Sequence, residues 1–189
     1  MSEELHARVA EKLEEVGPAV AMALEIKIDN YFDVVRGIID DFAAKKGLIT
    51  VYITASVPSS ALNGALQALE VNTNGLMFVD CVSHSLMGSI QRIENTAYVE
   101  SPTMLENIIL KVEYFSRIAE GRKMVVVIDS FNSFAMSSEH KMLSEFLTVL
   151  MTSLKAKEAY PIVLTIPDQL KPDLKEMLTM VCDVIVPLS

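Results

Sequence analysis

The stretch that decides the fold is Met124-Val125-Val126-Val127-Ile128-Asp129-Ser130. Its five consecutive apolar residues are typical of a β-strand that is buried on both faces, as the strands of a parallel sheet are. The run ends in an acid and a hydroxyl residue. Such an ending either places functional side chains at the carboxyl edge of a sheet or only caps the following turn or helix. The residues by themselves leave both interpretations open.

Comparable apolar runs alternate with helix-like segments from residue 48 onward. This alternation predicts an α/β fold, in which a doubly wound, mostly parallel sheet of about six strands carries helices on both faces. A chain of 189 residues is long enough to bury a substantial core as one globular unit. The predicted strands cover residues 48–54, 76–80, 96–99, 124–128, 162–166 and 181–186.

Two of the predicted helices have a clear apolar face. The first is predicted to be capped by Ser101, with Pro102 in its first turn and Gly121 at its end, and the second to be capped by Ser137 or Ser138. Their apolar residues recur at spacings of three and four and therefore form stripes that face the sheet. The stripes are Leu105, Ile108, Ile109, Val112, Phe115 and Ile118 in the first helix, and Leu143, Phe146, Leu147, Leu150 and Leu154 in the second.

The first 46 residues are predicted to form an N-terminal helical arm, followed by the α/β domain over residues 47–189. One helix is expected to run through Val16, where Gly17 and Pro18 break it. A second helical stretch is expected through about Lys46 and to end at Gly47. The narrow apolar stripe of the first helix could pack on its own domain or on a partner subunit. That stripe consists of Leu5, Val9, Leu13 and Val16.

Composition limits the classes of function. Twenty-five acidic and 16 basic side chains give a net charge of −9, so we expect no nucleic acid as partner. A hydrophobic content of 51% argues against disorder. No apolar run reaches the length of a membrane span, and we expect no membrane association. Cys81 and Cys182 fit buried, reduced thiols, so we expect a cytoplasmic location.

The run from Met124 to Ser130 resembles the Walker B strand of RecA/KaiC-like ATPases, including the archaeal KaiC-like group. The order of the predicted elements strengthens this resemblance. Two strands and a helix lie between the first strand and this run, and a helix, a strand, a short helix and a closing strand follow it. The resemblance covers roughly residues 47–189. It implies a RecA-like fold in which Asp129 lies beside a phosphate-binding loop.

The loop after the first strand departs from the pattern of that family. Members carry G-x-x-x-x-G-K-[ST], in which glycines let the backbone wrap the phosphates, lysine neutralises them and the hydroxyl binds Mg²⁺. This chain has Ala55-Ser56-Val57-Pro58-Ser59-Ser60-Ala61-Leu62 instead. Ala55 and Ser60 stand at the glycine positions, Ala61 at the lysine and Leu62 at the hydroxyl. Charge-assisted hydrogen bonds contribute ~1.5 to 3 kcal/mol each, so we expect much weaker ATP binding.

Six residues nevertheless form a candidate site for a nucleotide or another anion. The serines could hold a small anion at the start of the next helix, or Ser59 or Ser60 could simply cap that helix. Asp80 ends the second strand, in the region where KaiC-like ATPases tend to offer a catalytic glutamate. The candidate residues are Ser56, Ser59, Ser60, Asp80, Asp129 and Ser130.

Cys81 and His84 invite a different interpretation, because with Ser83 and Ser85 they resemble the parts of a nucleophilic hydrolase or a metal site. The glycine-flanked elbow of hydrolases and the spacing of zinc ligands are both missing. A buried cysteine beside a surface histidine explains the same residues.

We therefore expect a non-catalytic RecA/KaiC-like domain that serves as a regulatory or protein-interaction module, for example in signalling. A protein partner or self-association follows from that role. No catalytic residue, metal or cofactor is expected. The alternative is an ATPase relative that binds a nucleotide or anion through a non-standard phosphate loop, and Mg-ATP would be its cofactor.

Overall fold

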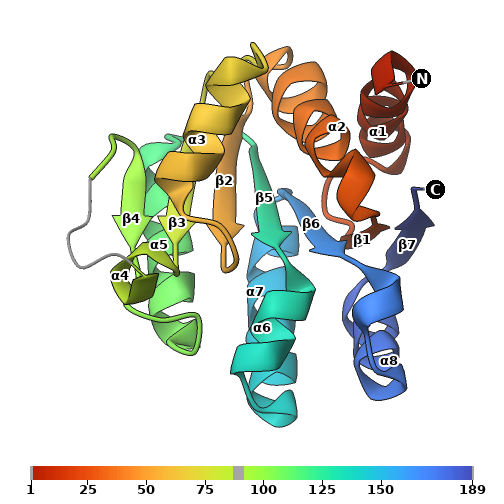
Figure 1. Ribbon diagram of the computed structural model, residues 1–189, viewed down its shortest axis with the longest axis vertical. Helices are drawn as coiled ribbons and strands as arrows, with labels where there is room; N and C mark the ends of the chain where they lie inside the picture. The colour runs from red at the N-terminus through yellow and green to blue at the C-terminus, as the bar shows by residue number, and fades with distance from the viewer. Residues whose placement is uncertain (1, 87–91, 189) are drawn as a thin grey trace.

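The computed structural model describes residues 2–86 and 92–188. Seven strands form a single sheet, and every pair of neighbours is parallel (Figure 1). The order across the sheet is β4-β3-β2-β5-β6-β1-β7. This confirms the predicted α/β fold, with one strand more than expected. The strands are β1 (Met22–Glu25), β2 (Ile49–Thr54), β3 (Leu76–Asp80), β4 (Thr96–Tyr98), β5 (Met124–Asp129), β6 (Tyr160–Thr165) and β7 (Val184–Pro187).

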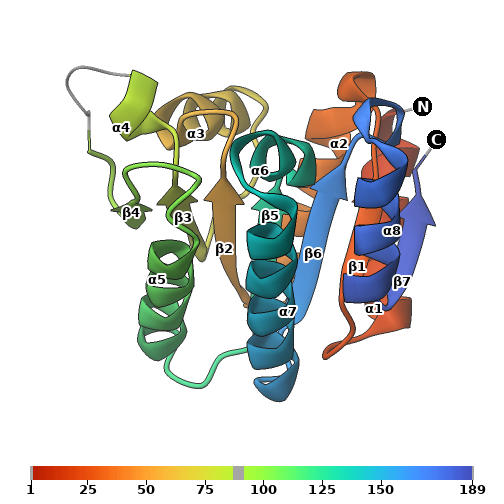
Figure 2. The same ribbon diagram turned by 90° about the horizontal axis from the view of Figure 1, so that it is seen from below.

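Helices cover both faces of the sheet, as Figure 2 shows. One face carries α5 (Leu105–Ile118), α7 (His140–Ala156) and α8 (Pro172–Val181), and the other carries α1 (Ser2–Val16), α2 (Tyr31–Arg36), the π-helix η2 (Gly37–Ala44) and α3 (Ser59–Ala68). Short helices follow the strands: η1 (Ile28–Asn30), α4 (Ser83–Leu86), α6 (Phe131–Ser137) and η3 (Pro167–Gln169). In the described parts of the chain, no helix has the length and apolar character that a bilayer crossing needs.

The central strand β5 is buried along its whole length. Val126 and Ile128 belong to the core under α5 and α7, whereas Val125 and Val127 belong to the core under α1, η2 and α3. Successive side chains of a strand point to opposite faces, so an uninterrupted apolar run is what a strand between two helical layers requires. The apolar run read from the sequence therefore has a direct structural cause.

The expectation that the first 46 residues are purely helical is wrong at residues 22–25. This segment forms β1, which lies between β6 and β7 and pairs with both. A short apolar run of this kind cannot be told from a buried helical segment by periodicity alone. The α1 helix packs on its own domain, against α2 and η2, and buries Val9 and Leu13 there. The boundary between residues 46 and 47 stays a prediction.

Several predicted element ends differ from the structure. Ser101 does not cap α5, because its hydroxyl accepts a hydrogen bond from the amide of Thr103 in a turn before the helix begins. Glu139, not Ser137 or Ser138, is the residue that precedes α7. The last strand begins at residue 184 instead of 181, because α8 continues to residue 181. The predicted apolar stripe of α7 is confirmed, because its five residues are all buried: Leu143, Phe146, Leu147, Leu150 and Leu154.

Gly37 permits the close approach of α1 to η2. A Cβ atom at Gly37 would lie 2.5 Å from the backbone oxygen of His6 and 2.8 Å from the Cβ atom of Val9. We expect Gly37→Ala to lower the free energy of unfolding by about 1 to 3 kcal/mol, because α1 must move away. Urea unfolding monitored by circular dichroism measures this change.

Gly64 provides the matched control, since it lies inside α3 and a Cβ atom there would meet nothing within 4 Å. Gly64→Ala is expected to raise the free energy of unfolding by about 0.5 to 1 kcal/mol through helix propensity. Equal effects of the two substitutions would show that α1 is not held at this distance in solution.

Candidate functional site

The candidate site lies at the carboxyl ends of β3, β2 and β5. In the strand register Thr54 is paired with Asp80 on one side and with Asp129 on the other. The helix after β2 packs on one face of the sheet, whereas α7, which follows β5, packs on the opposite face. Neighbouring strands whose connections leave toward opposite faces create the crevice in which open α/β sheets bind their ligands.

Asp80 is fully buried and accepts four hydrogen bonds. Its Oδ2 accepts from the Ser59 backbone amide at 2.7 Å and from the Ser83 hydroxyl at 2.6 Å. Its Oδ1 accepts from the backbone amides of Val82 and Ser83, both at 2.9 Å. Burial by itself would raise the pKa of Asp80, but the hydrogen bonds from Ser59 and Ser83 outweigh it and lower the pKa below its usual value. The carboxylate thus holds together the starts of α3 and α4.

Asp129 is buried among tyrosine hydroxyls. Its Oδ2 accepts hydrogen bonds from Tyr31 at 2.5 Å and from Tyr52 at 2.7 Å, and the two hydroxyl oxygens lie 3.0 Å apart. Burial raises the pKa of Asp129, and the two hydrogen bonds only partly oppose that rise. Burial and the nearby Asp129 carboxylate also raise the pKa of both tyrosines. The three side chains therefore form a closed polar cluster between β2, β5 and α2.

Solved structures of other proteins share this architecture, although no family model and no curated protein sequence matches the chain. The KaiC-like protein PH0186 of the hyperthermophilic archaeon Pyrococcus horikoshii matches with a TM-score of 0.60 and 15% identity, over 90% of this chain and 72% of its own. The fold is RecA/KaiC-like. The resemblance read from the sequence is thereby confirmed at the level of the fold.

Two further RecA/KaiC-like structures match over most of the chain. The flagellar accessory protein FlaH of Methanocaldococcus jannaschii has a TM-score of 0.59 and 11% identity, over 94% of this chain and 76% of its own. The uncharacterized protein PH0321 of P. horikoshii, solved in complex with an unknown peptide, has a TM-score of 0.68 and 14% identity, over 94% of this chain and 82% of its own. In this chain the loop after β2 and the end of β5 lie side by side, because the Ala55 amide donates a hydrogen bond to the Asp129 carbonyl at 2.8 Å.

The structure brings only some of the six predicted site residues into contact. Ser59 and Asp80 are directly hydrogen-bonded, as described above. Neither Ser59 nor Ser60 provides the cap of α3, because Pro58 precedes the helix and the Asp80 carboxylate accepts its first amide. Ser56 is exposed, and Ser60 is half-buried. Ser130 caps α6 by accepting a hydrogen bond from the amide of Ser133 at 3.3 Å.

The nucleophile and metal interpretations of Cys81 are not supported by its surroundings. Cys81 is fully buried, and burial raises the pKa of its thiol. A reactive cysteine needs the opposite conditions, namely exposure and a lowered pKa. His84 is exposed. Among residues 2–86 and 92–188, no three His, Cys, Asp or Glu side chains gather in a way that could hold a metal ion.

Sequence reasoning missed Tyr31 and Tyr52. A tyrosine inside the otherwise apolar strand β2 is a signal that could have been used, since a buried phenol needs a hydrogen-bond partner. No comparable signal marks Tyr31, which lies 98 residues before Asp129 at the start of α2. Tyr31 reaches Asp129 because α2 follows β1 onto the face of the sheet that also buries Tyr52.

Proposed function

We propose that this chain is a non-catalytic RecA/KaiC-like domain that acts as a regulatory or protein-interaction module. The observation that carries the proposal is the Asp80 carboxylate at the start of α3, where it accepts the Ser59 amide. Helix N-terminal amides are the groups that hold phosphate in ATPases. In this chain the Asp80 carboxylate accepts the first amide of α3, so an incoming triphosphate would meet a buried like charge there and no lysine in residues 55–62.

The Asp129 cluster supports the same proposal. A Walker B aspartate that binds Mg²⁺ needs a carboxylate oxygen directed at the ion or at a water molecule that coordinates it. Hydroxyl groups that donate hydrogen bonds to the carboxylate compete for the same lone pairs. The Asp129 Oδ2 atom already accepts two phenol hydrogen bonds. Asp129 joins α2 to β5 by accepting these hydrogen bonds. This structural role accounts for an aspartate at this position without nucleotide chemistry.

The similar proteins support an interaction role in a general way. FlaH is described as an accessory protein, and PH0321 was solved with a peptide bound. A RecA/KaiC-like domain that no longer needs a nucleotide would keep its surfaces for partners. Self-association and binding of another protein are both consistent with this role.

Titration calorimetry with Mg-ATP, Mg-ADP and phosphate tests the proposal. We expect no saturable heat up to about 1 mM ligand, the upper end of ordinary substrate affinities. The isosteric variant Asp129→Asn should give the same flat titration as the wild type. Micromolar binding of Mg-ATP that disappears in Asp129→Asn would overturn the proposal.

A second candidate function is the binding of a small anion by the same loop. It is favoured by Ser59, whose hydroxyl oxygen is buried without a hydrogen-bond partner in the part of the chain that the structure describes. In that case phosphate would give saturable heat in the wild type and lose it in Ser59→Ala. Ser56, Ser60 and Ser130 would be the next residues to replace.

A further inference from the structure

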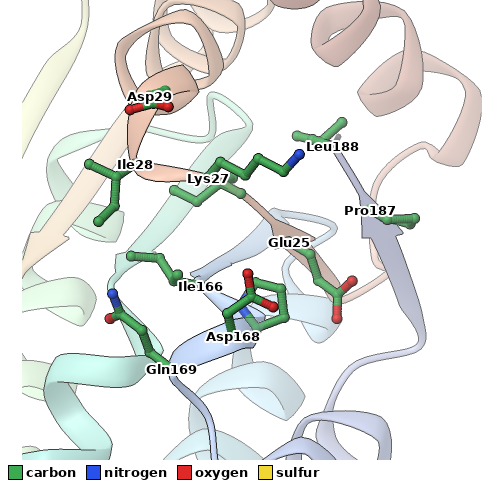
Figure 3. Close-up of a pocket in the computed structure, with 11 residues that line it drawn as sticks. Glu25, Lys27, Ile28, Asp29, Ile166, Asp168, Gln169, Pro187 and Leu188 are labelled. Atoms are coloured by element: carbon green, nitrogen blue, oxygen red, sulfur yellow. The ribbon is translucent and has the colours of Figure 1, made fainter.

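A second crevice lies at the same carboxyl edge of the sheet, between the ends of β6 and β1. The chain leaves β6 through η3 toward α8 on one face, and leaves β1 through η1 toward α2 on the other face. The two strands are neighbours, so this is a second point at which connections diverge. A cleft of about 500 Å³ opens there, within the size range of ligand sites (Figure 3).

Two asparagine side chains fix the walls of the cleft. On one side Asn132 of α6 accepts from the Ile166 amide at 2.9 Å and donates to the Ile166 carbonyl at 3.0 Å. On the other side Asn30 accepts from the Lys27 amide at 3.0 Å and donates to the Leu188 carbonyl at 2.9 Å. The loops that follow β6, β1 and β7 are therefore held in place by side chains. A cleft with fixed walls is formed in advance of any ligand.

The lining of the cleft combines apolar side chains with unpaired acids. Ile28 and Ile166 lie on one side of the cleft in Figure 3, and Ile28 is 66% exposed. The cleft also contains three carboxylates against a single ammonium group. In residues 2–86 and 92–188, no ion pair involves any of these four charges. The charged residues are Glu25, Asp29 and Asp168, and Lys27.

We propose that this cleft binds an extended segment of a partner protein in which a lysine or arginine stands next to an apolar side chain. This assignment rests on the proposed function, because it gives an interaction domain its binding surface and the chemistry of its partner. The excess of carboxylates attracts a cation and repels nucleotides and other anions. The exposed Ile28 offers contact area that a hydrophilic cation cannot use.

Peptide binding followed by NMR tests the assignment. The probe is an octapeptide of alternating leucine and lysine, added to the ¹⁵N-labelled protein of 189 residues. Saturable shifts are expected at the amides of residues 25–29, 166, 168 and 169, which line the cleft. An octapeptide of leucine and glutamate should cause no such shifts. Spermidine and a serine–lysine octapeptide should bind more weakly, because they carry the charge without the apolar contact.

Matched charge variants test whether the acids of the cleft do the binding. We expect the double variant Glu25→Gln/Asp168→Asn to weaken binding of the leucine–lysine peptide about fivefold, since two favourable charge contacts are lost. The control is Glu11→Gln/Glu106→Gln, which removes two exposed acids elsewhere on the surface and changes the net charge equally. The control should weaken binding of the leucine–lysine peptide less than about twofold, because it removes only the long-range attraction of two distant carboxylates.

Several results would overturn the assignment. The leucine–lysine peptide could fail to bind, or its shifts could lie outside the cleft. The leucine–glutamate peptide or spermidine could bind as tightly as the leucine–lysine peptide. The two double variants could weaken binding equally. The same labelled sample separates this failure from failure of the proposed function. Shifts at residues 54–60 upon addition of Mg-ATP would contradict the non-catalytic role, whereas a missing peptide response contradicts only the cleft.

Discussion

Replacing Asp80 with alanine is expected to lower the free energy of unfolding by about 3 to 5 kcal/mol, the largest effect of any single substitution considered for this protein. The carboxylate is fully buried and accepts hydrogen bonds from Ser59, Val82 and Ser83. Alanine leaves the buried amides of these residues without an acceptor. Urea unfolding at neutral pH measures the loss.

Two variants separate the role of Asp80 from general effects of removing an acid. Asp80→Asn keeps one acceptor oxygen and is expected to cost about half as much as alanine. Asp173 provides the matched control, because it is an exposed aspartate in the first turn of α8. Asp173→Ala is expected to cost less than about 1 kcal/mol. If Asp80→Ala cost no more than the control, the carboxylate would not organise the starts of α3 and α4.

The pH dependence of stability provides a second test of the same carboxylate. The pKa of Asp80 is lower in the folded protein than in the unfolded chain. The contribution of the Asp80 carboxylate to the free energy of unfolding is therefore fully present above the ordinary aspartate pKa of ~3.9. This contribution is lost as the pH falls through the lower pKa of the folded protein. We expect Asp80→Asn to lose less stability than the wild type over this acid range. Parallel curves for the two proteins would contradict the assignment.

The second large effect is expected at the Asp129 cluster. Tyr31→Phe and Tyr52→Phe should each lower the free energy of unfolding by about 1.5 to 3 kcal/mol, because each removes a hydrogen bond to a buried carboxylate. The double variant should cost more than either single variant, since the carboxylate is then left without these donors. Tyr114→Phe is the control, because Tyr114 is 54% exposed on α5. It should cost less than about 0.5 kcal/mol.

Neutralising the acid should rescue the double tyrosine variant. Adding Asp129→Asn removes the uncompensated charge, so we expect it to recover part of the lost stability. Asp129 also has a pKa above its ordinary value in the folded protein. The contribution of Asp129 to the free energy of unfolding is thus most favourable below the ordinary aspartate pKa. This contribution is lost as the pH rises through the raised pKa of the folded protein. Equal stability of the double and triple variants at all pH values would show that the charge at residue 129 does not limit stability.

The central part of the fold could be predicted from local sequence patterns. The buried strands β2, β3 and β5 show as apolar runs, and the stripe of α7 shows as apolar residues at spacings of three and four. Both signals arise because each face of the sheet must be covered by the apolar side of a helix. β1 could not be predicted in this way, because its four residues are too few to show a period.

The candidate site was predictable only in part. Asp80 and Asp129 stand at the ends of recognisable strands, so the rule that parallel sheets carry ligand groups at that edge singles them out. Their hydrogen-bond partners decide what they do. Ser59 lies 21 residues from Asp80, and Tyr31 lies 98 residues from Asp129. No local pattern encodes such pairs.

The sequence by itself thus determined the α/β architecture and the absence of glycine and lysine from residues 55–62. Only the tertiary structure decided that the Asp80 carboxylate occupies the start of α3 and that Asp129 is enclosed by two phenols. The physical reason is the range of the interactions involved. Burial patterns repeat along neighbouring residues, whereas a buried carboxylate is satisfied by whichever donors the packed chain brings to it.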